Sequence, residues 1–100
     1  MNRRVNIHGA GKDFEKHSGI RAFSLEFELI LELFYSGPMN SGEIVKRINA
    51  SQASFSSISR NLRQQGVIVS TPGDVDRRMV IYALSDETRN FLSRYAIAHD

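Results

Sequence analysis

The sequence predicts a mainly α fold in which a helix-turn-helix is followed by a two-stranded β hairpin, and three observations support this. Residues 51–66 (SQASFSSISRNLRQQG) have the pattern of a short helix, since Phe55, Ile58 and Leu62 recur at helical spacing. A second short helix precedes this one across a tight turn. After Gly66 the pattern changes to two β-branched, apolar runs that are separated by turn-forming residues.

The length and composition fit one globular domain. One hundred residues, 41% of them hydrophobic and 24% charged, are enough for one core and too few for two. No apolar run is long enough to cross a bilayer, and no signal-peptide pattern is present, so no membrane partner is expected. The absence of cysteine excludes disulfides, thiolate metal sites and cysteine-based redox sensing, and makes the cytoplasm the expected location.

Residues 1–19 are expected to be a flexible basic arm that precedes a domain over residues 20–100. The segment contains three glycines and shows no sustained periodicity. Its lysines and arginines are Arg3, Arg4, Lys12 and Lys16.

Residues 20–35 (IRAFSLEFELILELFY) are expected to form a long helix that ends before Gly37-Pro38, because proline cannot continue a helix. Its apolar residues form two stripes, and a small domain can bury one of them in its own core. The second stripe needs either the C-terminal helix or a second subunit. We favour the second subunit, with Leu25, Leu29 and Leu33 as dimer contacts. The series Glu26, Glu28 and Glu32 is interpreted as a solvated face.

Residues 40–48 are expected to form the first helix of the helix-turn-helix. Asn40 and Glu43 have the spacing of a capping box. Asn49 suits a left-handed turn, Ser51 is a good N-cap for the next helix, and Gly66 is a good residue to end it.

The outer face of the 51–66 helix is the candidate DNA-reading surface. Its small residues allow close approach to DNA, its hydroxyls and amides can bond base edges or phosphates, and its arginines add positive charge. An ordinary solvated face is the alternative, but such faces usually mix both charge signs, and this face carries no acidic residue. The candidate DNA contacts are Ser51, Gln52, Ser54, Ser56, Ser57, Arg60, Asn61 and Gln64.

Residues 67–71 and 79–84 are expected to form a hairpin with a turn-rich tip over residues 72–76. Arg77 and Arg78 lie where the second strand leaves the loop, and a guanidinium at such a tip suits the electronegative minor groove. The alternative is that both arginines only pair with Asp74 and Asp76. We expect one arginine to be held by Asp76 and the other to remain free for DNA.

A last helix is expected after Ser85, which can cap it. Phe91 and Tyr95 lie on its apolar side and are tentative dimer contacts. The three histidines lack ligand spacing, so neither a metal site nor another cofactor is expected. No nucleophile–base set and no phosphate-binding glycine loop occurs, so the chain is not expected to be an enzyme.

These segments, in this order, resemble the MarR family of winged helix-turn-helix transcription regulators over residues 30–85. The resemblance is carried by 48–51 (INAS), 54–57 (SFSS), 62–68 (LRQQGVI) and 76–85 (DRRMVIYALS). It implies a homodimer on a pseudo-palindromic duplex, with the 51–66 helix in the major groove, Arg78 in the minor groove and Asp76 orienting the wing. The chain departs from the family at Thr88, where glycine is usual, and in having only about one helix after the wing.

The sequence therefore predicts a sequence-specific binder of double-stranded DNA, acting as a repressor. Whether a small-molecule effector binds is left open. The alternative is a winged helix that serves as a protein-interaction module without specific DNA binding. Salt dependence of binding to random duplex DNA separates the two, because an interaction module shows little binding and little salt dependence.

Overall fold

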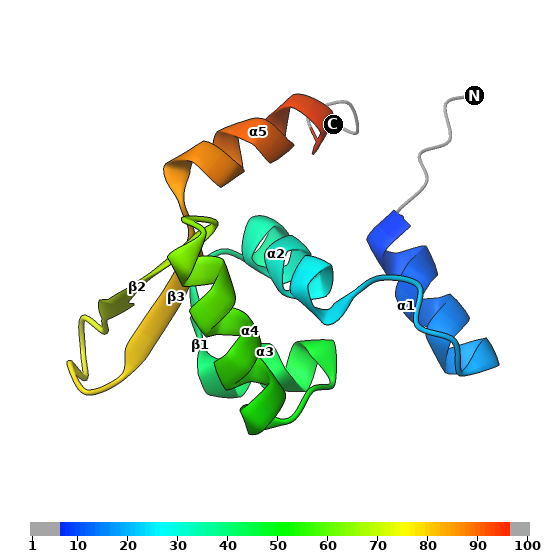
Figure 1. Cartoon of the computed structure of the whole chain (residues 1–100), viewed down its shortest axis with the longest axis horizontal. Coiled ribbons are helices and arrows are strands. Elements are labelled where there is room, and N and C mark those ends of the chain that lie inside the picture. The colour runs from blue at the N-terminus through cyan, green and yellow to red at the C-terminus, as the bar shows by residue number, and fades with distance from the viewer. Residues whose placement is uncertain (1–6, 97–100) are drawn as a thin grey trace.

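The computed structural model describes the backbone of residues 7–96 and the side chains of residues 9–94. A body of three helices carries a projecting β hairpin, and a further helix extends from the body on each of two other sides (Figure 1). Within the described residues, no helix combines the length and the hydropathy needed to span a membrane. The elements are α1 (Ile7–Ser18), α2 (Leu25–Ser36), β1 (Met39–Asn40), α3 (Ser41–Ile48), α4 (Gln52–Gln64), β2 (Ile68–Pro72), β3 (Val80–Leu84) and α5 (Asp86–Ala96). The mainly α fold with a wing is therefore confirmed.

The core lies where α2, α3 and α4 meet the sheet. Apolar side chains from every one of these elements are buried together, so the hairpin is anchored on the helices rather than standing alone. The ring of Phe55 on α4 meets that of Tyr82 on β3 edge-to-face, with centroids 5.0 Å apart. The buried core residues are Leu29, Leu33, Met39, Ile44, Ile48, Phe55, Ile58, Leu62, Ile68 and Leu84.

The sheet has three antiparallel strands in the order β1-β3-β2, one more than the sequence predicts. The hairpin strands pair from Ile68 opposite Leu84 to Pro72 opposite Val80. The added strand β1 has two residues, and Met39 lies opposite Tyr82. Two residues are too short to show an alternating pattern, so only the tertiary structure reveals this strand.

The predicted helix ends of the helix-turn-helix are confirmed. Asn40 and Glu43 form a complete capping box at the start of α3, and Asn49 has left-handed backbone angles at its end (φ 56°, ψ 52°). The Ser51 hydroxyl caps α4, and Gly66 follows that helix with φ 76°. These local signals fix the turn between α3 and α4, and thereby the direction in which α4 leaves it.

The start of α5 is also as predicted. The Ser85 hydroxyl accepts a hydrogen bond from the Thr88 backbone N–H at 3.2 Å and donates one to the Thr88 hydroxyl at 3.0 Å. Thr88 therefore takes part in the helix cap at the position where it departs from the family pattern.

The expectation of a flexible arm over residues 1–19 is wrong in its secondary structure, because residues 7–18 form α1. Arg3 and Arg4 lie outside the described residues. The long helix expected over 20–35 is also shorter, since Ser24 caps α2 and accepts a hydrogen bond from the Phe27 N–H. Helix α1 approaches the intervening loop closely: a Cβ on Gly11 would lie 2.6 Å from a ring carbon of Phe23.

The expectation that Leu29 and Leu33 lie in a dimer interface is wrong, whereas a dimer contact at Leu25 stays a prediction. Leu29 and Leu33 are 0% exposed within the single chain, and Leu25 is partly buried against the same core. Helix α2 is the central helix, with α3, α4 and β3 packed around it, so the stripe that contains Leu29 and Leu33 is covered, while Phe27 on the other stripe is 39% exposed.

The expectation of a solvated face at Glu28 and Glu32 is wrong as well, while Glu26 is exposed. The Arg21 guanidinium pairs with Glu28 at 3.0 Å. The Lys12 ammonium of α1 lies 3.0 Å from one Glu32 oxygen, and Arg47 of α3 lies 3.5 Å from the other. Burial of these carboxylates is tolerated because cations accompany them, and Lys12 and Arg47 thereby join α1 and α3 to α2.

Candidate nucleic-acid interface

Helix α4 is held with one face inward. Phe55, Ile58 and Leu62 are buried in the core, and Ser59 is buried beside them, its hydroxyl donating to the Ser56 carbonyl at 3.3 Å. This stripe fixes the rotation of the helix about its axis, because residues three or four apart share a face. The opposite face must then point to solvent.

That opposite face is exposed. Ser57, Arg60 and Gln64 share it, since they are spaced by three and four residues, and they are not packed against the body of the chain. In the part of the chain that the structure describes, no hydrogen bond or ion pair engages these three side chains. Further exposed candidates on α4 are Gln52, Ser56 and Asn61.

Two of the candidate hydroxyls are used for capping. The Ser51 oxygen accepts the Ser54 backbone N–H at 3.0 Å, and the Ser51 hydroxyl donates to the Ser54 hydroxyl at 3.0 Å. The first turn of α4 is therefore ordered without any ligand. These hydroxyls still lie at the exposed end of the helix, but their local role is the cap.

The wing tip carries an ordered arginine. The Arg78 guanidinium bonds both oxygens of Asp76, at 3.2 and 3.4 Å, and the Arg78 backbone N–H donates to the same carboxylate at 3.0 Å. These bonds hold the pKa of Asp76 below its ordinary value of 3.8. The Arg78 side chain nevertheless remains 93% exposed.

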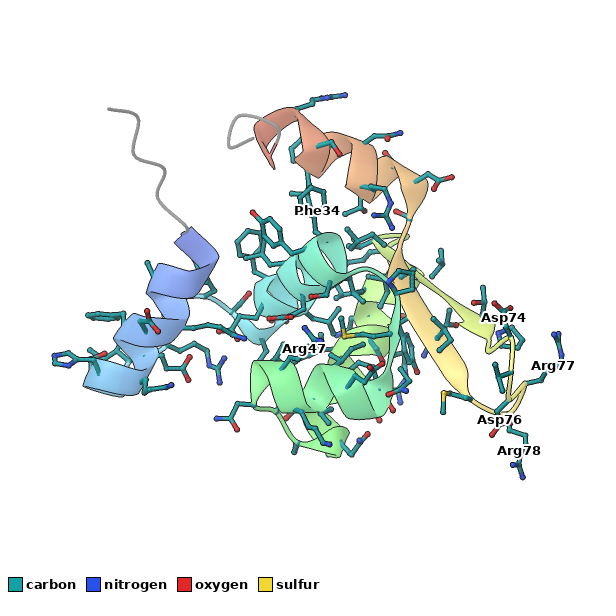
Figure 2. The ribbon with its side chains drawn as sticks, turned by 180° about the vertical axis from the view of Figure 1, so that it is seen from behind. Phe34, Arg47, Asp74, Asp76, Arg77 and Arg78 are labelled. Carbon is teal, nitrogen blue, oxygen red and sulfur yellow. The ribbon has the colours of Figure 1, made fainter. Side chains whose placement is uncertain are left out.

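Arg77 is exposed at the same tip and, within the described residues, has no ion pair. Figure 2 shows Arg77 and Arg78 at the end of the hairpin, pointing in different directions, and Arg78 lines the groove beside the start of α3. Arg78 is thus held by Asp76 while Arg77 is not, as the sequence predicts for one of the two arginines.

The backbone of the wing tip is closed by two hydrogen bonds. The Gly73 N–H donates to the Met79 carbonyl at 2.7 Å, and the Met79 N–H donates to the Asp76 carbonyl at 3.0 Å. Val75 is fully exposed at this tip and was not among the candidate residues. An isolated apolar residue in a turn carries no periodic signal, so sequence reasoning had no means to single it out.

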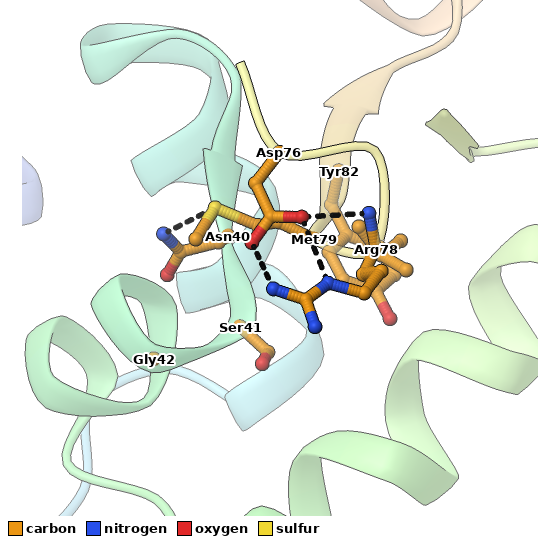
Figure 3. A pocket seen from close by; sticks show the side chains of 8 residues that line it. Asn40, Ser41, Gly42, Asp76, Arg78, Met79 and Tyr82 are labelled. Atoms are coloured by element: carbon orange, nitrogen blue, oxygen red, sulfur yellow. Dashed lines mark hydrogen bonds and ion pairs between the residues drawn. The ribbon is translucent and has the colours of Figure 1, made fainter. Parts of the chain in front are cut away.

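A shallow groove of about 610 Å³ separates the start of α3 from the wing (Figure 3). The Asn40 side-chain amide donates to the Met79 sulfur across it, at 3.5 Å. Sequence reasoning missed this groove because its two walls lie almost forty residues apart in the chain. Its lining residues are Asn40, Ser41, Gly42, Asp76, Arg78, Met79, Val80 and Tyr82.

The basic residues of the helix-turn-helix are not all available for a polyanion. Arg47 is committed to Glu32 and also donates to the Ser36 hydroxyl at 3.0 Å. The exposed arginines nearest to the candidate reading face are therefore Arg60 and Arg63 of α4. Among the described residues, no group of three or more histidine and carboxylate side chains could hold a metal ion.

Comparison by sequence connects this geometry to known proteins. A family profile described as MarR family matches residues 24–80, which span α2 to the first residue of β3. A search of curated proteins by sequence found no match.

Comparison by structure gives the same fold. A mutant of ZitR from Lactococcus lactis is 17% identical, with a TM-score of 0.68 over 93% of this chain and 70% of that chain. The adhesin competence repressor of Streptococcus pyogenes is 20% identical, with a TM-score of 0.60 over 92% of this chain and 67% of that chain. Reduced AbfR bound to DNA is 19% identical, with a TM-score of 0.62 over 91% of this chain and 64% of that chain.

Proposed function

The chain belongs to the MarR family of transcription regulators, and from this premise we propose that it is a sequence-specific binder of double-stranded DNA that acts as a repressor. Regulators of this family are generally not enzymes. The observation that carries the proposal is the outward face of α4, exposed, free of carboxylates and accompanied by the two arginines of the wing tip.

Helix α4 is proposed to lie in the major groove. Its exposed amides and guanidinium groups can bond base edges, and its serines are small enough to allow close approach to the duplex. Ser57, Arg60 and Gln64 are central to this contact because they share the exposed face, and Gln52, Ser56 and Asn61 lie beside them. Ser51 and Ser54, at the capped end of the helix, are proposed to contact the sugar–phosphate backbone of the DNA.

The wing is proposed to reach the adjacent minor groove. Arg78 is held by Asp76 in an exposed position, so little of its side-chain entropy remains to be lost when DNA binds. A guanidinium is attracted by the negative potential of a narrow minor groove. Arg77 is proposed as a second contact to the backbone phosphates.

A homodimer is proposed, as two copies are needed to read the two halves of a pseudo-palindromic site. Its contacts cannot come from Leu29 or Leu33, which the core already buries. Large apolar residues are half exposed on α1, α2 and α5, and these supply the alternative surface. They are Phe14 on α1, Phe27 and Tyr35 on α2, and Phe91 on α5.

The test is selection of bound duplexes from a random pool, followed by titration of the recovered duplex with the parent protein and two variants. Arg60→Ala is expected to weaken binding about tenfold, as for loss of one arginine contact to a base. Lys16→Ala is the control, because it removes one positive charge from an exposed residue of α1, outside the helix-turn-helix and the wing. Equal binding by parent and Arg60→Ala would contradict the proposed reading face.

The same titration at two salt concentrations separates this function from a protein-interaction module. Phosphate neutralisation makes the affinity for DNA fall steeply with salt, whereas an interaction module shows neither appreciable binding nor such a slope.

A further inference from the structure

Met79 carries an exposed thioether in a chain without thiols. Its side chain is 43% exposed, whereas Met39, the other methionine among the described residues, is 5% exposed in the core. Because the sequence contains no cysteine, no thiolate of this chain competes for a mild two-electron oxidant. Of these two methionines, Met79 is therefore the one whose sulfur such an oxidant can reach.

The Met79 sulfur lies at the junction of the wing and the helix-turn-helix. It accepts the Asn40 side-chain amide at 3.5 Å, and Asn40 is itself the N-cap of α3. The neighbouring residue is Arg78, whose guanidinium lines the same groove (Figure 3). The backbone of Met79 is fixed at both its N–H and its carbonyl by the closing bonds of the wing. A chemical change at the sulfur therefore takes place beside a fixed backbone and next to the proposed minor-groove contact.

We propose that Met79 is an oxidation site, and that conversion of its thioether to the sulfoxide by hydrogen peroxide weakens DNA binding. A sulfur lone pair attacks one peroxide oxygen, the S–O bond forms and the O–O bond breaks. The sulfur atom is oxidised by two electrons, and the departing hydroxide takes the remaining peroxide proton to leave as water. The effect on DNA rests on the proposed function, whereas the oxidation itself does not.

Oxidation of Met79 to the sulfoxide adds a strong hydrogen-bond acceptor to the groove. A thioether is a weak acceptor, whereas a sulfoxide oxygen is polar and accepts strongly. The new oxygen competes with the Asp76 carboxylate for the Arg78 guanidinium and accepts more strongly from the Asn40 amide. Arg78 exchanges its bonds to Asp76 for a bond to the sulfoxide oxygen, so the orientation proposed for its contact with DNA is lost.

The experiment treats the full chain with hydrogen peroxide, removes the oxidant, and locates the added oxygen by peptide mass mapping. DNA binding to the selected duplex is then measured before and after treatment. Met79 is expected to be oxidised before Met39, and affinity is expected to fall about tenfold, as for loss of one guanidinium contact. Methionine sulfoxide reductase is expected to restore it. Met79→Leu is the control: it keeps the side-chain volume and every other methionine, and its affinity is expected to be insensitive to peroxide.

The outcomes distinguish this inference from the proposed function. Failure of the untreated protein to bind any duplex would contradict the function, while the mass map would still report on the site. Tight DNA binding that survives full oxidation of Met79 would overturn the inference alone. It would also be overturned if Met39 reacted first, if Met79→Leu lost affinity in the same way, or if treatment abolished the cooperative unfolding transition.

Discussion

At the scale of single residues, Asp76 and Arg78 are the pair whose geometry is best defined. Two side-chain bonds and one backbone bond join them at the wing tip, while the arginine stays exposed. The carboxylate brings a negative charge close to where DNA is proposed to lie. The Asp76 carboxylate can therefore favour DNA binding only by orienting Arg78. This role predicts the opposite effect on DNA affinity from the one that net charge alone predicts.

Asp76→Asn is expected to lower DNA affinity several-fold, because the asparagine no longer holds the guanidinium by charge-assisted bonds. Removal of a negative charge alone would raise the affinity instead. Asp74→Asn is the matched control, since Asp74 is exposed at the same tip without such a bond to Arg78. Titration of both variants against the selected duplex decides between the two effects, and stronger binding by Asp76→Asn would rule out the orienting role.

The pKa of Asp76 provides a second measurement, independent of DNA. Its carboxyl is expected to titrate below 3.8 in the folded chain, because bonds from Arg78 favour the ionised form. The Asp76–Arg78 interaction therefore stabilises the wing fully at pH values above the ordinary pKa of 3.8. This stabilisation is lost as the pH falls through the lowered pKa of Asp76. Carboxyl carbon chemical shifts measured against pH report this value. Arg78→Ala is expected to return it most of the way toward 3.8, the residual shift coming from the backbone N–H of residue 78.

At the scale of elements, the ion pairs of α2 hold three helices together. Glu32 is buried between Lys12 of α1 and Arg47 of α3, and the Lys12 ammonium also donates to the Arg47 carbonyl at 2.8 Å. The two cations are partly exposed, which reduces what each pair contributes. Loss of the buried carboxylate nevertheless leaves both cations without their shared partner.

Glu32→Gln is expected to lower the free energy of unfolding by about 1–2 kcal/mol, less than for a fully buried pair because its partners meet water. Glu26→Gln is the control on the same helix, where the side chain is exposed and a change within about 0.5 kcal/mol is expected. Urea denaturation followed by circular dichroism measures both. Equal stabilities of the two variants would show that the buried pairs do not join the helices.

The tip of the wing depends on one glycine. A Cβ added at Gly73 would lie 2.7 Å from the backbone oxygen of Asp76, and backbone cannot move aside as a flexible side chain does. Gly73→Ala is therefore expected to displace residues 73–79 and to weaken DNA binding, while α2, α3 and α4 stay folded. Amide chemical shifts map the change, and Thr71→Ala on the adjacent strand is the control. Unchanged shifts at Asp76 would contradict the prediction.

At the scale of the whole molecule, α1 and α5 extend away from the compact body (Figure 1). Phe34 points from α2 toward α5 (Figure 2), while Phe91 on α5 is 51% exposed. The longest axis of the molecule, 47 Å, runs from the wing at one end to α1 at the other (Figure 1). A second copy seated on their apolar side would bury surface that one chain leaves in water.

Phe91→Ser is therefore expected to shift the protein toward the monomer in sedimentation velocity and to reduce DNA affinity. Ile20→Ser is the matched control, because it removes an exposed apolar residue from the loop before α2, outside both the wing and the proposed dimer contacts. A dimer is also expected to select duplexes whose half-sites are about 10 base pairs apart, one helical turn. A selected site with a single half-site would contradict the dimer.

The sequence alone determined the local features: the caps at Asn40, Ser51 and Ser85, the left-handed turn at Asn49, the hairpin, and the inward stripe of α4. Each depends on residues within one or two helical turns, so backbone preferences and periodicity are sufficient to reveal it.

The tertiary structure decided which surfaces are covered. It buried Leu29 and Leu33 within one chain, buried Glu28 and Glu32 against cations from distant segments, and added β1 to the sheet. It also brought Met79 to Asn40 across the groove. These outcomes depend on what packs against a residue from elsewhere in the chain. The local sequence around a helical carboxylate is the same whether the side chain faces water or a lysine from another helix. The free energy that favours the buried, paired position comes from the long-range contact with that lysine.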